Sequence, residues 1–122
     1  MVKRKFKPVL PSMREKKRYL VFEVLSNGKI SFDEVYNAII NGAMSFIGQL
    51  GMAKAGIIVL EDKWNEKMQR GILKVSHKSV DALRASLLFI TKIGNEPVIV
   101  KSVGLSGILK KAENRYIKLN VD

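Results

Sequence analysis

The chain has 122 residues, which is the size of one domain, and 47% of them are apolar, enough for a hydrophobic core. Its net charge of +11 points to an acidic partner, either nucleic acid, an anionic membrane or an acidic protein. The sequence has no cysteine, which excludes disulfides, thiolate zinc sites and a cysteine nucleophile. It also lacks the ~20 consecutive apolar residues of a membrane helix and the apolar run of a signal peptide. We therefore expect a cytoplasmic protein that does not engage a membrane.

Positive charge is concentrated at the N-terminus. Eight of the first 18 residues are basic and only Glu15 is acidic, which places +7 there and +4 on the other 104 residues. The basic residues are Lys3, Arg4, Lys5, Lys7, Arg14, Lys16, Lys17 and Arg18. Two prolines interrupt this stretch, and its few apolar residues show no periodicity. Residues 1–17 are therefore predicted to be an extended basic arm, and residues 18–122 a single domain.

The first half of the domain predicts a strand followed by a helix. Residues 18–25 alternate between two apolar faces and predict the strand, and residues 26–29 predict a turn. Ser31 and Glu34 then have the spacing of a capping box. Apolar residues recur at helical intervals from Phe32 onwards, and Gly51 is the expected stop.

The second half predicts three more strands and two helices. Residues 55–61 read as a strand with apolar side chains on both faces, and residues 70–76 as the next strand. Ser79 is a candidate cap for a second helix. A fourth strand is expected over residues 98–103. A short helix rich in Lys and Arg is then expected to begin at Ser106 or Gly107.

This order of elements predicts an α+β fold. Two split strand–helix–strand units with right-handed crossovers give a ferredoxin-like, two-layer sandwich of the RNA-recognition-motif type. The expected sheet has four antiparallel strands in the order 4-1-3-2. Two long helices should lie on one of its faces, with an additional C-terminal helix.

The predicted sheet lacks the aromatic residues on which RNA-recognition motifs stack bases. Arg70 and Gly71 match the start of the usual third-strand pattern, but Ile72 and Lys74 stand at the stacking positions. Base stacking on the sheet is therefore disfavoured. The open face is expected to carry Tyr19, Val21, Ile57, Val59 and Ile72. Such a face is either a protein interface, including one for self-association, or it is covered by the C-terminal helix.

We predict no catalytic or metal-binding residue in this chain. His77 is the single histidine and has no partner in the sequence with which to share a metal, so a surface or capping role is expected. Glu61 and Asp62 are neighbours on a predicted strand, so their side chains point to opposite faces. Ser106 and Gly107 precede a helix, and their backbone can hold an RNA phosphate because Lys110 and Lys111 follow closely.

Several segments together resemble a known family. They are RYLVFEV at 18–24, GIIVL at 56–60, Arg70-Gly71, ASLLFIT at 85–91 and SVGLSGILKKA at 102–112. In this order they are similar to the archaeal ribonuclease P protein component 2 family, which is related to the subunit shared by eukaryotic ribonuclease P and ribonuclease MRP. The resemblance covers about residues 16–118, and it depends on the ordered set because no single motif is diagnostic.

The resemblance implies a non-catalytic subunit of the ribonucleoprotein that removes the 5′ leader of precursor tRNA. It implies that the catalytic RNA holds the Mg²⁺ ions, so that the chain needs no cofactor of its own. It also implies pairing with ribonuclease P protein component 3, with which the chain would support the catalytic domain of the RNA. Two alternatives stay open: a ribosome-associated or DNA-binding protein of the same fold and charge, and a stand-alone ferredoxin-like enzyme.

On this view the arm and the C-terminal helix meet RNA phosphates, which positions the RNA without reading its sequence. The expected RNA-binding residues are Lys3, Arg4, Lys5, Lys7, Arg14, Lys16, Lys17, Arg18, Ser106, Gly107, Lys110, Lys111 and Arg115.

Overall fold

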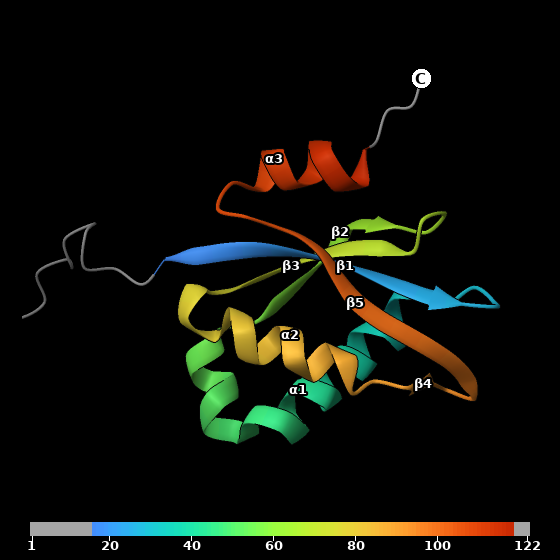
Figure 1. Cartoon of the computed structure of the whole chain (residues 1–122), viewed down its shortest axis with the longest axis horizontal. Helices are drawn as coiled ribbons and strands as arrows, with labels where there is room; N and C mark the ends of the chain where they lie inside the picture. The colour runs from blue at the N-terminus through green and yellow to red at the C-terminus, as the bar shows by residue number, and fades with distance from the viewer. Residues whose placement is uncertain (1–15, 119–122) are drawn as a thin grey trace, which may run out of the picture.

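A central antiparallel sheet separates two long helices from a short C-terminal helical segment in the computed structural model, which describes residues 16–118 (Figure 1). The strands are β1 (Lys17–Ser26), β2 (Ile58–Asn65), β3 (Arg70–Ser76), β4 (Lys92–Ile93) and β5 (Glu96–Ser106). The helical elements are α1 (Phe32–Ala55), the 3-10 turn η3 (His77–Ser79), α2 (Val80–Leu88), α3 (Leu109–Ala112) and the π-helical turn η4 (Glu113–Ile117). Within residues 16–118, no helix is long and apolar enough to cross a membrane.

The strand order is β2-β3-β1-β5-β4, with every pairing antiparallel. The prediction of an α+β fold with an antiparallel sheet is confirmed. The predicted count of four strands is wrong, because the two-residue strand β4 pairs with the start of β5 through a turn at Gly94. Two residues are too few to show alternation, so sequence patterning could not reveal β4. The ferredoxin-like assignment of the whole fold stays a prediction.

Local capping signals place the start of α1 correctly but not its end. The Glu34 N–H donates to Ser31 Oγ at 3.3 Å, and the Ser31 N–H donates to Glu34 Oε1 at 3.2 Å, as the capping box predicts. Gly51 was the predicted stop, but α1 continues to Ala55, with a kink at Gly48, where φ is 76°. Gly56 ends the helix in the left-handed conformation.

The second helix begins at Val80, directly after Ser79, at the predicted position. Ser79 makes no capping hydrogen bond to α2. The chain instead leaves β3 through the 3-10 turn η3, where Ser76 Oγ accepts a hydrogen bond from the Lys78 N–H at 3.4 Å. The 3-10 turn matters for function because it places His77 and Lys78 at the point where β3 ends.

Two hydrophobic clusters lie on opposite faces of the sheet. The larger one fills the space between the sheet and the helices α1 and α2, and includes Leu20, Phe22 and Leu73, all fully buried. The smaller one lies beneath α3 and η4 and contains Val21, Ile72, Ala112 and Ile117. Figure 1 shows α3 on the side of the sheet away from α1 and α2. The C-terminal segment is therefore packed against the sheet.

Candidate nucleic-acid interface

Four strands start or finish at one end of the sheet. β1 and β2 begin there, and β3 and β5 end there. Lys17 pairs with Ser76, and Tyr19 pairs with both Lys74 and Ser106. This end of β1 lies on the left of Figure 1. The antiparallel pairing thus gathers basic residues from separate parts of the sequence.

The end of α1 and the loop before α3 reach the same place. A Cβ added at Gly56, the cap of α1, would lie 3.2 Å from Lys17 Nζ. One added at Gly107 would lie 3.6 Å from a guanidinium nitrogen of Arg18. We call this surface, with the exposed lysines that follow on α3, the basic end. It consists of Lys16, Lys17, Arg18, Lys54, Lys74, Lys78, Lys110 and Lys111.

The charges of the basic end are not neutralised within the part of the chain that the structure describes. There the ion pairs use the cations Lys63, Arg70, Arg84 and Lys118, and none uses a residue of the basic end. Most of the basic-end side chains are exposed, and those of Arg18 and Lys74 are half-buried. A group of exposed cations without carboxylate partners favours a polyanion, because phosphates can replace the counterions.

The Ser106–Gly107 turn lies beside Arg18, but the Ser106 hydroxyl is already hydrogen-bonded to the backbone of Ile108. The Ile108 N–H donates to Ser106 Oγ at 3.0 Å, and Ser106 Oγ lies 3.1 Å from the Ile108 carbonyl oxygen. The turn therefore orients the start of α3, where Lys110 and Lys111 are exposed. Arg115 is also exposed, further along on η4.

The other residues predicted to bind RNA are Lys3, Arg4, Lys5, Lys7 and Arg14, which lie outside the described residues.

The sheet face opposite α1 and α2 is covered. Val21 and Ile72 are fully buried beneath α3 and η4. Tyr19 is half-buried at the border of the same cluster. The sequence left two alternatives open for this face, a protein interface or cover by the C-terminal helix. The structure shows that the C-terminal helical segment covers it. Ile72 therefore cannot stack a base.

The side chains of β2 point to the opposite faces of the sheet from those that the sequence predicts. Val59 belongs to the cluster beneath α1 and α2, and Ile57 packs against that cluster, so neither shares a face with Val21 and Ile72. Leu60 lies on the covered face instead. The expected face was wrong because residues 57–60 are all apolar, so alternation could not select between the two sides.

Polar contacts hold the C-terminal segment to the β2–β3 hairpin. Lys63 Nζ lies 3.2 Å from Glu113 Oε2, and Lys118 Nζ lies 3.5 Å from the same oxygen. Burial raises the pKa of Glu113, but the hydrogen bond from Lys63 and the charges of Lys118 and Lys63 outweigh it and lower the pKa below its usual value. These contacts keep Glu113 charged while it is packed against the sheet.

Two backbone carbonyls of the same segment are also held. Arg70 donates to the Tyr116 carbonyl oxygen at 2.9 Å, and the Asn65 side-chain amide donates to the Ile117 carbonyl oxygen at 3.2 Å. Arg70 also lies 3.6 Å from Glu23. The cover over the sheet is thus fastened at its C-terminal end by β2 and β3.

The titratable residues singled out in the sequence lie apart. Glu61 and Asp62 are exposed on β2, and the Asp62 carboxylate lies 4.0 Å from Lys63 Nζ. His77 contacts the Lys16 carbonyl oxygen at the basic end. Within residues 16–118, no three His, Asp or Glu side chains are grouped so as to hold a metal ion.

The sequence of residues 18–117 matches the model of the Rpp14/Pop5 family. This span includes nearly every element that the structure describes. The chain belongs to the Rpp14/Pop5 family. The resemblance that the sequence motifs indicated is therefore confirmed.

Other members of the Rpp14/Pop5 family resemble the chain along most of its length. It is 34% identical over 107 residues to ribonuclease P protein component 2 of Thermococcus kodakarensis, covering 88% of each protein. It is 32% identical over 112 residues to ribonuclease P protein component 2 of Methanosarcina mazei, covering 92% of this chain and 93% of that one.

A solved structure supports the fold. A chain in the cryo-EM structure of yeast ribonuclease MRP has a TM-score of 0.60 to this protein at 13% identity. The match covers 78% of this chain and 76% of that one.

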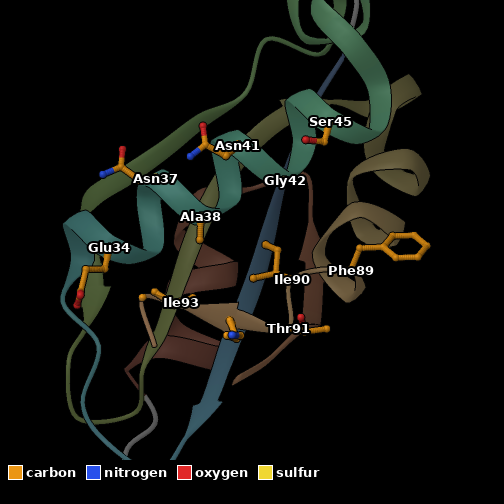
Figure 2. A pocket seen from close by; sticks show the side chains of 12 residues that line it. Glu34, Asn37, Ala38, Asn41, Gly42, Ser45, Phe89, Ile90, Thr91 and Ile93 are labelled. Atoms are coloured by element: carbon orange, nitrogen blue, oxygen red, sulfur yellow. The ribbon is translucent and has the colours of Figure 1, made fainter. Parts of the chain in front are cut away.

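The chain also has a groove that the sequence did not predict. A cavity of about 560 Å³ runs between α1 and the segment that joins α2 to β4. Figure 2 shows Asn37, Asn41 and Ser45 following one another along α1, with Phe89 on the other wall. The four-residue spacing of the three polar residues was a visible signal, because it places them on one helix face. Phe89 could not be assigned to the groove without knowing how α1 and α2 pack.

Proposed function

We propose that this chain is a protein subunit of ribonuclease P in the cytoplasm, and that it binds the catalytic RNA through the basic end and the N-terminal arm. The ribonucleoprotein would remove the 5′ leader of precursor tRNA. The observation that carries the proposal is the basic end, where cations from β1, β3, η3, α1 and α3 converge without carboxylate partners in residues 16–118. The relatives named ribonuclease P protein component 2 support the choice of RNA.

The basic end suits the backbone of a folded RNA better than its bases. Lysine and arginine neutralise phosphates and let RNA strands approach one another, but such contacts carry no direct sequence information. The sheet face on which RNA-recognition motifs stack bases is covered here, and Ile72 is fully buried. The protein would therefore position the RNA, and the cleavage site would be determined by the RNA.

In this proposal the chemistry belongs to the RNA. Mg²⁺ ions bound by the RNA would hydrolyse the phosphodiester bond, and this chain would contribute no catalytic group. Protein component 3 would bind the same RNA domain together with this chain.

Reconstitution tests the proposal. The full-length chain is added to the catalytic RNA and component 3, and cleavage of precursor tRNA is followed. We expect cleavage to rise with added chain, and to rise less with a variant in which Lys74, Lys78, Lys110 and Lys111 are each Gln. A control for loss of charge elsewhere replaces Lys67 and Lys92, which lie at the other end of the sheet, with Gln.

Two results would contradict the proposal. One is unchanged cleavage on adding the native chain. The other is a tagged chain that co-purifies with ribosomal subunits or DNA and not with a structured RNA, as the alternative basic-protein function predicts. A separate check uses the variants Glu61→Ala and Asp62→Ala. At saturating protein, the ribonucleoprotein reconstituted with either variant should cleave precursor tRNA at a rate within a few fold of that with the native chain. A loss of ~1000-fold would reveal a catalytic role for these carboxylates.

A further inference from the structure

His77 is the single histidine of the chain, and the structure places it beside the cations of the basic end. It directly follows β3, and its backbone N–H donates to the Lys16 carbonyl oxygen at 2.8 Å. The ring Nδ1 lies 3.2 Å from the same oxygen. A carbonyl oxygen can only accept, so the ring contact requires a hydrogen on Nδ1. In the neutral ring the second nitrogen, Nε2, therefore carries no hydrogen and can accept a proton.

The Nε2 atom of His77 is accessible to solvent. Within residues 16–118 it makes no hydrogen bond, because the ring bonds through Nδ1. In that part of the chain, the only buried side-chain nitrogen or oxygen without a hydrogen-bond partner is Arg70 Nε. His77 Nε2 has no partner there either, so it is not buried. A proton can therefore reach Nε2 without breaking the contact between Nδ1 and Lys16.

The elements around the ring are mostly basic at this end of the sheet. Both α1 and α2 contact the turn η3, which contains His77, and β1 is paired with the end of β3. The carboxylate that α2 contributes here is Asp81, in its first turn, and it lies 3.7 Å from a guanidinium nitrogen of Arg84. The cations that the other elements bring to this end are Lys16, Lys17, Arg18, Lys54, Lys74 and Lys78. A proton on Nε2 would add one more cation to this surface.

We propose that His77 is an RNA-binding residue of the basic end, and that its Nε2 takes up a proton and donates a hydrogen bond to an RNA phosphate when the RNA binds. The inference rests on the proposed function, because it assumes that the basic end binds RNA. The proton comes from the solvent, and a phosphate oxygen accepts the hydrogen bond. The nearby negative charge stabilises the protonated ring.

Proton uptake makes RNA binding depend on pH. Histidine is the side chain that ordinarily changes its charge between pH 5 and 8. Below this range the ring adds a cation that can neutralise a phosphate, and above it the ring is neutral. Both the RNA affinity and the slope of log K against log salt should therefore gain a contribution from His77 as the pH falls.

A comparison of the native full-length chain with His77→Asn tests this role. The asparagine amide can still donate to the Lys16 carbonyl oxygen, but it has no nitrogen at the position of Nε2 and no charge at any pH. Affinity for the catalytic RNA is measured by filter binding over a range of salt concentrations, at about pH 6 and about pH 8, with component 3 present. The α-amino group also titrates in this range, but it is common to both proteins, as are the groups of the RNA and component 3.

At pH 6 we expect His77→Asn to bind RNA about threefold to tenfold more weakly than the native chain, through the loss of one charge-assisted hydrogen bond at an accessible site. Its salt slope should be shallower by about 0.7–0.9, which corresponds to one phosphate. At pH 8 the two affinities should agree within about twofold, because the native ring is then neutral. Melting temperatures at both pH values check that the fold is retained.

Lys78→Gln is the matched control, because it removes a neighbouring charge that does not titrate in this range. Its salt slope should be shallower than that of the native chain by a similar amount at both pH values.

Equal pH dependence of the native chain and His77→Asn would overturn the proposal, because the proton would then bind elsewhere. A loss of affinity that is the same at both pH values would also overturn it, since it would leave His77 only a structural role. If Lys78→Gln changes the salt slope while His77→Asn does not, the RNA-binding function of the basic end stands and only the role of His77 is rejected. If neither variant changes RNA binding, the basic end is not the RNA interface, and the role of His77 fails with it.

Discussion

The ring of Tyr116 occupies the space that a side chain at Gly104 would need. A Cβ added at Gly104 would lie 2.2 Å from Tyr116 Cζ, closer than any real contact allows. Gly104 is paired with Val21 in β1, so the close approach brings η4 directly onto the covered sheet face. The cover over the sheet therefore depends on a glycine in β5.

Gly104→Ala should displace Tyr116 and loosen the C-terminal segment. We expect a loss of about 1–3 kcal/mol in the free energy of unfolding, the usual cost of overpacking. Urea denaturation measures the loss. Gly28→Ala is the matched control, because its added Cβ would lie 3.7 Å from Glu96, an ordinary contact, and it should be close to neutral. Equal stability of the two variants would show that Tyr116 can move aside at little cost.

Ile72→Asp should destabilise the fold itself. Ile72 is fully buried between the sheet and η4, so the substitution places an unpaired charge in an apolar cluster. A loss of about 3 kcal/mol or more is expected. Ile58→Asp, at a position that is 53% exposed, should cost far less. Circular dichroism during thermal unfolding compares the two, and a native melting temperature for Ile72→Asp would mean that the sheet face is open in solution.

Stability should depend on pH through Glu113. Its pKa is lower in the folded chain than the ordinary value of 4.5, because Lys63 and Lys118 outweigh the effect of burial. The carboxylate therefore stabilises the fold above about pH 4.5, and this contribution is lost as the pH falls through 4.5 towards the folded pKa. The free energy of unfolding of Glu113→Gln should be lower than that of the native chain at pH 7, and the difference should shrink as the pH falls below 4.5.

Denaturant titrations at several pH values check this expectation. The expectation is contradicted if the difference in free energy of unfolding between the native chain and Glu113→Gln is the same at pH 7 and at pH 3.5.

The arm should contribute strongly to the salt dependence of RNA binding. Replacing its five basic residues Lys3, Arg4, Lys5, Lys7 and Arg14 with Gln removes five positive charges from a stretch that the sequence predicts to lie outside the core. If about half of the five meet phosphates, the slope of log K against log salt should become shallower by about 2, at 0.7–0.9 per phosphate. The melting temperature should change little.

Filter binding of RNA, with component 3 present, measures this slope. Lys67→Gln combined with Lys92→Gln is the control for a loss of charge away from the basic end. Parallel salt lines for the native chain and the arm variant would show that the arm does not touch phosphates. RNA binding would then rest on the basic end of the domain.

The sequence by itself determined the features that depend on near neighbours. The capping box of Ser31 and Glu34 is closed within four residues, so its pattern predicts the start of α1 without reference to the rest of the chain. The bounds of β3 were predicted correctly as Arg70–Ser76 because its apolar run is bordered by polar residues. The excess of basic residues in the first 18 positions is likewise a property of the sequence alone.

Tertiary structure decided the features in which distant segments compete. Several glycines could have ended α1, and Gly56 does so because Ile57 and Val59 then pack beneath the helices. The open sheet face is covered because Tyr116 fits against Gly104 and Glu113 is held by Lys63. The basic end exists because antiparallel pairing brings Lys17, Lys74 and the end of β5 together. No local sequence pattern predicts these contacts, because each depends on how the whole sheet is paired and covered.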